Sequence, residues 1–296
     1  MKVKRLDKPI TIRPCDMVRY KIAGNVREIR FSGRHCSGGF IKKLSKEEYL
    51  NCLTGEVKQI KHYQSRKDDL SNIKKTLTRG RDMINANVDD VSHCKWITLT
   101  YADNMTDPDR LYKDYNRFNV RLRRKYGACE YITAAEPQGR GAWHLHVLLI
   151  FDHPAPYMDN KDVASLWGQG FVKVKRLDDV DNVGAYLTAY LGDLECTDSD
   201  APDELVKTVS VLDDTGQPVS KRFIKGARLS MYPPGFRIFR WSRGCLKPII
   251  KDMEYQRAKK QVDGLTPTYQ KSIQITDDKT DYQNVLQYEF YNLRYK

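Results

Sequence analysis

Hydrophobic residues in the middle of the chain follow the periods of a small sheet with helices beside it. Four segments are rich in β-branched and aromatic residues or alternate apolar with polar positions, which predicts strands at residues 95–101, 129–135, 142–151 and 171–177. Apolar stripes at helical spacing predict a helix from Pro108, a second one capped by Asn160, and a third from about Val180 to Leu191. The order is that of the split βαβ, or ferredoxin-like, arrangement, in which helices cover one face of a four-stranded antiparallel sheet.

The flanking regions carry weaker patterns of the same kinds. Strands are predicted at residues 17–23 and 26–31, followed by a helix over residues 65–87. Towards the end of the chain, alternation predicts a hairpin and two more strands, at residues 209–212, 219–223, 272–275 and 285–291. The fold class is therefore α+β, with a central domain over residues 92–194 between an N-terminal accessory region (1–91) and a C-terminal one (195–296).

The charge of the chain indicates what it binds. Lys and Arg number 51 against 38 Asp and Glu, which leaves a net charge of +13. Such an excess favours a polyanionic partner, nucleic acid first and an anionic membrane second. No apolar stretch is long enough to span a bilayer and the first residues lack a signal-peptide pattern, so we expect a cytoplasmic protein without a membrane partner. The seven cysteines are scattered without a C-x-x-C pair, which supports neither a disulfide framework nor a cysteine zinc site.

Two histidines and a glutamate are the candidates for a metal site. His144 and His146 lie two positions apart in a predicted strand, so their side chains share one face. Glu136 ends the neighbouring antiparallel strand, and the short connection brings it beside His144. Mixed nitrogen and oxygen ligands with open positions suit Mg²⁺ or Mn²⁺ better than a closed zinc site. The structural alternatives are hydrogen-bonded histidines and a Glu136 that is solvated or paired with Arg140.

A pair of tyrosines follows on the last predicted helix of the central domain. Tyr186 and Tyr190 are four residues apart, which places them on one helix face. A phenol has a pKa of about 10, so a tyrosine nucleophile needs activation by a metal or a neighbouring cation. Two tyrosines at this spacing are more often part of a core, and the pair alone is a weak signal.

The combination of these blocks is more specific than any one of them. WITLTYADN, AEPQGRGAWHLHVLLIF, LWGQGFVKV and VGAYLTAYLGD occur in this order. The set resembles the HUH endonucleases, and more closely the rolling-circle replication initiators of bacterial plasmids and phages. The resemblance covers roughly residues 94–193. It implies that the split βαβ domain at residues 92–194 is an HUH endonuclease domain.

The resemblance also implies a site and a reaction. Glu136, His144 and His146 would hold Mg²⁺ or Mn²⁺, while Tyr186 and then Tyr190 would act as nucleophiles on single-stranded origin DNA. The product is a 5′-phosphotyrosine link and a free 3′-hydroxyl that primes synthesis, with a host helicase and polymerase as partners in a bacterial cytoplasm. Many relatives carry a lysine where this chain has Ala189, or further on where it has Asp193. That lysine is therefore absent here or is supplied from elsewhere in the chain.

Several basic and aromatic residues are candidates for contacting the DNA. They are Arg123 and Arg124 at a helix end, Lys173 and Lys175 on a predicted strand, and Arg240, Trp241 and Arg243 in a segment that interleaves basic with aromatic residues. Each has a structural alternative, namely a solvated face, a contribution to the helix dipole, or an amphipathic strand with Phe239 and Trp241 half-buried.

Three other functions use the same features. A mobilisation relaxase typically carries its tyrosine before the histidines, the reverse of the order found here. A one-tyrosine transposase is usually a shorter protein. A non-catalytic nucleic-acid-binding module on an RRM-like frame would place aromatic residues on the exposed sheet face and need no metal.

Overall fold

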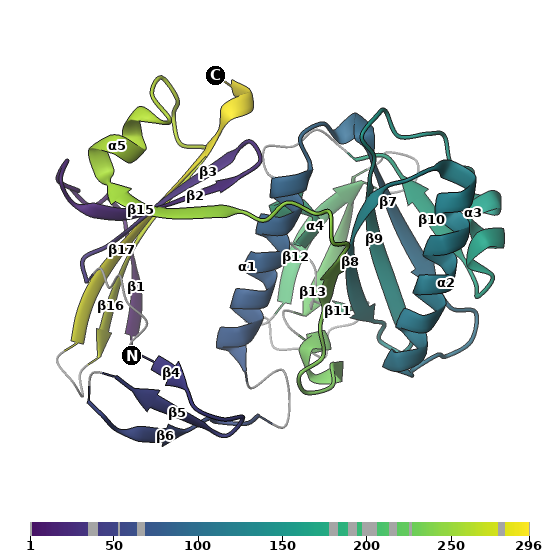
Figure 1. Ribbon diagram of the computed structural model, residues 1–296, viewed down its shortest axis with the longest axis horizontal. Coiled ribbons are helices and arrows are strands. Elements are labelled where there is room, and N and C mark those ends of the chain that lie inside the picture. Colours follow the sequence, from purple (N-terminus) through teal and green to yellow (C-terminus); the bar gives the residue numbers. More distant parts are fainter. Residues whose placement is uncertain are drawn as a thin grey trace. The chain divides into compact units, whose positions relative to one another are not determined.

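The computed structural model describes residues 2–34, 41–52, 54–63, 69–177, 183–188, 194–196, 206–212, 218–224, 227–277 and 282–295. The chain divides into two compact units (Figure 1). The first joins both ends of the chain, Met1–His62 and Lys247–Lys296, and the second comprises Tyr63–Leu246. Among the described helices, none has both the length and the apolar composition needed to cross a lipid bilayer.

A five-stranded antiparallel sheet forms the centre of the second unit. Its strands are β7 (Cys94–Thr100), β8 (Glu130–Pro137), β9 (Trp143–Ile150), β10 (Val172–Lys175) and β14 (Phe239–Trp241). Their order is β10-β7-β9-β8-β14, and every neighbouring pair is antiparallel. The four predicted strands thus lie in the order fourth, first, third, second, which is compatible with a split βαβ domain. The short strand β14 extends this sheet by one strand beyond β8.

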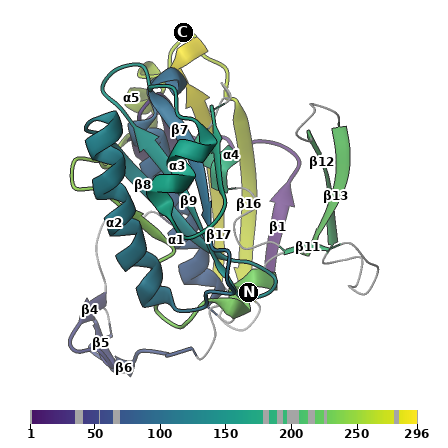
Figure 2. The same cartoon turned by 90° about the vertical axis from the view of Figure 1, so that its right-hand side faces the viewer.

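Two helices cover one face of this sheet. Helix α2 (Pro108–Tyr126) begins where the Asp107 side chain accepts a hydrogen bond from the Asp109 amide, and it ends at Gly127. Its buried stripe includes Leu111, Phe118 and Leu122, which join the core with the inward residues of the sheet. Helix α3 (Asn160–Trp167) lies beside α2 (Figure 2).

The predicted cap of α3 is wrong by one residue. Asp159 is the N-cap, since its carboxylate accepts from the amides of Lys161 and Asp162. The Asn160 side chain instead accepts a hydrogen bond from the Val174 amide at 2.7 Å and so ties the helix to β10. Both residue types can cap a helix, and the contact to a strand distant in sequence decides which one does.

Helices α1 (Leu70–Asn87) and α4 (Val183–Thr188) pack together beside the opposite face. At Gly80 of α1, a Cβ would lie 2.5 Å from the Phe239 ring, so the glycine allows this helix to approach β14. At Gly184 of α4, a Cβ would collide with the Arg81 carbonyl of α1. Both glycines therefore mark close approaches that side chains would prevent.

The remaining elements of the second unit are short. They are a three-stranded sheet of β11 (Leu194–Cys196), β13 (Pro218–Ile224) and β12 (Val206–Leu212), and the 3₁₀ helices Val91–His93 and Ala227–Met231. The antiparallel pair β12–β13 confirms the predicted hairpin.

The first unit is built on a six-stranded antiparallel sheet from both ends of the chain. Its order is β1-β16-β17-β3-β2-β15, formed by Lys2–Leu6, Tyr269–Asp277, Tyr282–Asn292, Val26–Ser32, Met17–Ala23 and Ile249–Glu254. Helix α5 (Tyr255–Lys260) packs on β2, and Val18, Ile29 and Tyr291 form the core. A separate small sheet contains β4 (Ile41–Lys43), β5 (Glu48–Asn51) and β6 (Val57–Gln59).

The predicted divisions after residues 91 and 194 both fall inside the second unit. Helix α1 and strand β14 belong to this unit because they pack on its sheet. Strands β16 and β17 pair with the N-terminal strands instead, through the β17–β3 ladder. Local patterns show where strands form, but such long-range pairings decide which unit they join.

Candidate functional site

The register of the central sheet brings the predicted metal ligands together on one face. His144 of β9 lies directly opposite Glu136 of β8 and Thr100 of β7. His146 lies in the same way between Thr98 of β7 and Ala134 of β8. Paired residues of neighbouring antiparallel strands share a face, which confirms the predicted placement of Glu136 beside His144.

His146 is held on both sides of its ring. Its Nε2 lies 3.0 Å from Oε2 of Glu136, and its Nδ1 lies 3.2 Å from the Thr98 hydroxyl. The Trp96 ring stacks on the imidazole with 5.5 Å between centroids and 15° between planes. These contacts fix the ring, so Nε2 points at the Glu136 carboxylate.

Arg228 is a site residue that the sequence analysis missed. Its guanidinium forms an ion pair with Oε1 of Glu136, and both side chains are largely buried. Arg228 lies in the 3₁₀ helix Ala227–Met231, next to Tyr232, whose hydroxyl donates to the Ala135 carbonyl of β8 at 2.9 Å. No local pattern marks this arginine, because it reaches the site from a segment far along the chain.

The expected alternative partner of Glu136 does not form that pair. Arg140 donates to the Gln138 side chain at 3.0 Å and to the Tyr101 carbonyl at 3.3 Å. Glu136 itself is 6% exposed, so it is not a solvated strand-end residue either.

Two nitrogen atoms of this site are buried without a hydrogen-bond partner. They are Nε2 of His144 and Nε of Arg228. Burial, together with the neighbouring His146, lowers the pKa of His144 to about 4, so this imidazole is neutral at pH 7. Burial acts to raise the pKa of Glu136, but the bond to His146 and the charge of Arg228 outweigh it and the pKa is lowered. Glu136 is therefore a carboxylate at neutral pH.

These donors suit a divalent cation in their chemistry. A neutral imidazole and a carboxylate are the protonation states that metal binding requires. The free Nε2 of His144 is also an atom that a bound cation would satisfy. As the side chains lie, however, no three His, Cys, Asp or Glu residues of the described part form a set that could hold a metal ion. The His144 and His146 rings stand perpendicular with centroids 6.3 Å apart.

Helix α4 carries the first candidate nucleophile. Tyr186 lies within α4, whose position is fixed by the Asn85 side chain of α1, which accepts from the Gly184 amide at 2.7 Å. The side chain of Tyr186 and the whole of Tyr190 lie outside the described residues, as do Ala189 and Asp193. The helix is predicted over Val180–Leu191 and is described over Val183–Thr188.

The basic candidates lie at three separate places. Lys173 and Lys175 share the histidine face, because they pair with Thr98 and Trp96 at the β10 edge. Arg123 and Arg124 are exposed in the last turn of α2, where they also oppose the helix dipole. On β14 and just after it, Phe239 is buried, Trp241 is half-buried, and Arg240 and Arg243 are exposed. The amphipathic-strand alternative is thus correct for the aromatic residues, while the arginines remain accessible.

Comparison with known proteins adds one match. Residues 94–195 match the family model of the replication-associated protein ORF2. Comparisons with curated proteins and with solved structures give no match. The matched segment runs from β7 through α4 to β11, and so includes Glu136, His144 and His146 but not Arg228 or β14. This match is consistent with a role in the initiation of rolling-circle replication.

Proposed function

We propose that this protein is a rolling-circle replication initiator that nicks and rejoins single-stranded DNA at an origin. The observation that carries the proposal is the gathering of Glu136, His144 and His146 on one sheet face inside the segment that matches replication-associated proteins. Two buried nitrogens without partners at the same place indicate that the site is completed by something other than the chain itself.

Glu136, His144 and His146 would hold Mg²⁺ or Mn²⁺. When bound, such an ion polarises a phosphoryl oxygen and orients the phosphate. Thr98 and Trp96 keep the His146 ring in place, and Arg228 keeps Glu136 ionised. Arg228 also supplies the fixed positive charge beside the site that Ala189 cannot supply, and its free Nε–H is a donor for an anion.

The covalent step exchanges one phosphodiester for another. The Tyr186 oxygen attacks the phosphorus, the bond from phosphorus to the 3′-oxygen breaks, and the phenol proton ends on the released 3′-hydroxyl. Tyr190 or a returning 3′-hydroxyl then resolves the 5′-phosphotyrosine. Because the ester energy is retained, joining needs no ATP. A host helicase and polymerase in the bacterial cytoplasm would complete replication.

A non-catalytic nucleic-acid-binding module is the second candidate. The observation in its favour is the Arg228–Glu136 ion pair, which neutralises the carboxylate where a cation would sit. In that case, DNA would bind without any dependence on divalent ions.

Covalent capture separates the two functions. The protein is incubated with single-stranded DNA that includes sequences flanking its gene, with and without Mn²⁺, and denaturation-resistant adducts are mapped by mass spectrometry. The proposal predicts an Mn²⁺-dependent adduct on Tyr186 or Tyr190. Tight binding without an adduct on any of these DNAs would contradict nicking and favour the binding module.

A further inference from the structure

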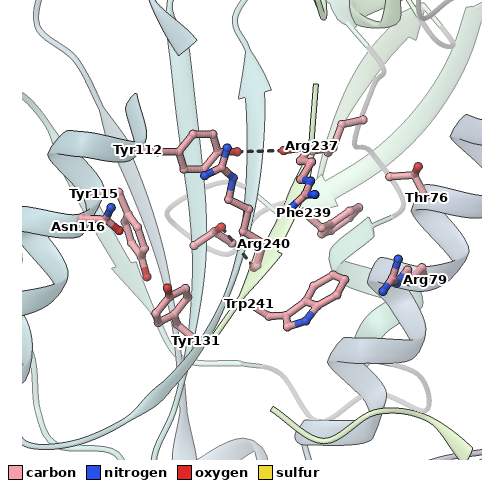
Figure 3. A pocket seen from close by; sticks show the side chains of 12 residues that line it. Thr76, Arg79, Tyr112, Tyr115, Asn116, Tyr131, Arg237, Phe239, Arg240 and Trp241 are labelled. Carbon is pink, nitrogen blue, oxygen red and sulfur yellow. Dashed lines mark hydrogen bonds between the residues drawn. The ribbon is translucent and has the colours of Figure 1, made fainter. Parts of the chain in front are cut away.

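A cavity of about 510 Å³ lies in the second unit around the edge strand β14 (Figure 3). Residues of α1 line one side and residues of α2 and β8 line the other, while β14 runs between them. Arg240 extends towards Tyr112 on the α2 side, and Trp241 extends towards α1 and Arg79. The proposed nicking site does not include any of these residues.

The charge of this cavity is entirely positive. Arg79, Arg237 and Arg240 line it, and no Asp or Glu does. All three arginines are exposed, and none forms an ion pair with a carboxylate in the part of the chain that the structure describes. Arg110 and Arg117 of the same unit, in contrast, are both paired with Asp114. Three unpaired cations around one cavity favour an anionic ligand.

The cavity is also lined by aromatic rings that the arginines keep accessible. The Arg240 guanidinium lies 3.3 Å from the centre of the Tyr112 ring, and that of Arg79 lies 4.9 Å from the centre of the Trp241 ring. Guanidinium groups stacked in this way keep their N–H donors free for phosphate oxygens. The Tyr112 hydroxyl donates to the Arg237 carbonyl at 3.0 Å, which fixes the rim of the cavity.

A ligand that uses both features must combine negative charge with a flat ring. A nucleotide has both, and a volume of about 300–1,000 Å³ is typical of cavities that hold molecules of that size. Sequence-tolerant binding of single strands relies on the same combination of cations and stacking aromatics. An inorganic anion alone would leave the aromatic walls unused.

We propose that this cavity is a subsite for a nucleotide of single-stranded DNA, with Arg240 and Arg79 on the phosphates and a base stacked on Trp241. The assignment of DNA rests on the proposed function. Trp241 lies on the same sheet face as His146, since it pairs with Ile132 of β8, which pairs with Leu148 of β9. A strand seated here lies outside the family-matched segment and would position origin DNA on the face that carries the nicking site.

The test measures binding of a fluorescein-labelled oligothymidylate by anisotropy, without divalent ions, over a range of salt concentrations. For Arg240→Ala, we expect weaker binding and a smaller slope of log affinity against log salt, by about 0.7 for one lost phosphate contact. For Trp241→Ala, we expect about 5-fold to 100-fold weaker binding with an unchanged slope, and recovery with Trp241→Phe.

Matched controls keep charge and exposure comparable. Arg257→Ala removes an exposed arginine of α5 in the first unit, and Tyr157→Ala removes an aromatic side chain that is 81% exposed. Neither should weaken binding to the extent of the cavity variants. Because Arg240 is exposed, its substitution tests the proposal even if Trp241→Ala does not fold.

Two outcomes would overturn the subsite. Affinity and salt slope equal to the wild type in Arg240→Ala and Arg79→Ala would show that DNA does not contact this cavity. Competition by thymidine monophosphate as strong as that by the oligonucleotide would indicate a free-nucleotide site instead. Failure of covalent capture with intact, cavity-dependent binding would contradict nicking only, so the two proposals fail separately.

Discussion

The two units each bury a carboxylate in an antiparallel sheet, and the two carboxylates differ in how completely the chain satisfies their surroundings. Glu289 of β17, 2% exposed, accepts hydrogen bonds from the Tyr255 hydroxyl at 3.0 Å, from the Gln287 amide at 2.7 Å and from the Tyr291 hydroxyl. The Lys259 ammonium lies 3.6 Å away and also donates to Tyr291. This network in the first unit is closed.

Glu136 of the second unit has partners too, but its neighbours are incomplete. His146 and Arg228 contact its two oxygens, while Nε2 of His144 and Nε of Arg228 are buried without partners. All such unpartnered side-chain atoms among the described residues lie in the second unit. Leaving a buried polar atom unpaired costs about 1–3 kcal/mol. The comparison therefore separates a network that stabilises the fold from one that a ligand completes.

The largest expected effect comes from removing the ligands themselves. His146→Ala and Glu136→Gln should lower Mn²⁺-dependent adduct formation by at least about 100-fold, the upper end of what even loss of a supporting partner costs a metal site. The measurement is the rate of adduct formation per folded protein. Glu289→Gln is the control and should retain the rate. An adduct rate in His146→Ala near that of the wild type would remove this site from the reaction.

The next effect concerns the packing of α4. Gly184→Ala places a Cβ 2.7 Å from the Asn85 oxygen and against the Arg81 carbonyl, so α4 has to move away from α1. Overpacking of this kind costs about 1–3 kcal/mol, whereas helix propensity alone predicts a gain of about 1 kcal/mol. Urea unfolding and the adduct rate should both fall below the wild type. A more stable variant would show that α4 is not held against α1.

Breaking the closed network should affect stability without affecting chemistry. Glu289→Gln presents an amide N–H₂ to groups that donate to the carboxylate, and we expect the free energy of unfolding to drop by about 1–3 kcal/mol. Urea unfolding followed by circular dichroism measures this change. A variant as stable as the wild type would contradict a structural role for Glu289.

The smallest effect is a pH dependence of stability from His144. Its pKa is about 4 in the folded state and about 6.5 in the unfolded chain, so the unfolded state binds more protons between these values. Stability without divalent ions should therefore fall as pH is lowered from about 6.5 to about 4. The lowered pKa of Glu136 acts in the same direction. His144→Gln should reduce the slope by up to one bound proton, and an unchanged slope would mean that His144 is not the titrating group.

Local pattern was sufficient for the central site because strand alternation determines it. Once β8 and β9 pair through a short connection, Glu136 and His144 must face each other and His146 must share their face. The same reasoning predicted the caps of α2, since Asp107, Pro108 and Gly127 are local signals.

What the sequence did not reveal depends on contacts between distant segments. Arg228 reaches Glu136 from a 3₁₀ helix with no periodic pattern of its own. Strand β14 joins the sheet through three residues only, and Gly80 looks like a helix defect until Phe239 is seen against it. The closed Glu289 network likewise needs the pairing of β17 with β16 and β3, which local alternation does not specify.

Direct measurement of cation binding tests the central comparison. Mn²⁺ is titrated into the protein without DNA, and free ion is followed by electron paramagnetic resonance. We predict one Mn²⁺ per chain, lost in His144→Ala and in Glu136→Gln and retained in Glu289→Gln. Binding that is absent from the wild type, or that survives in His144→Ala, would contradict the claim that the incomplete site of the second unit is completed by a metal ion.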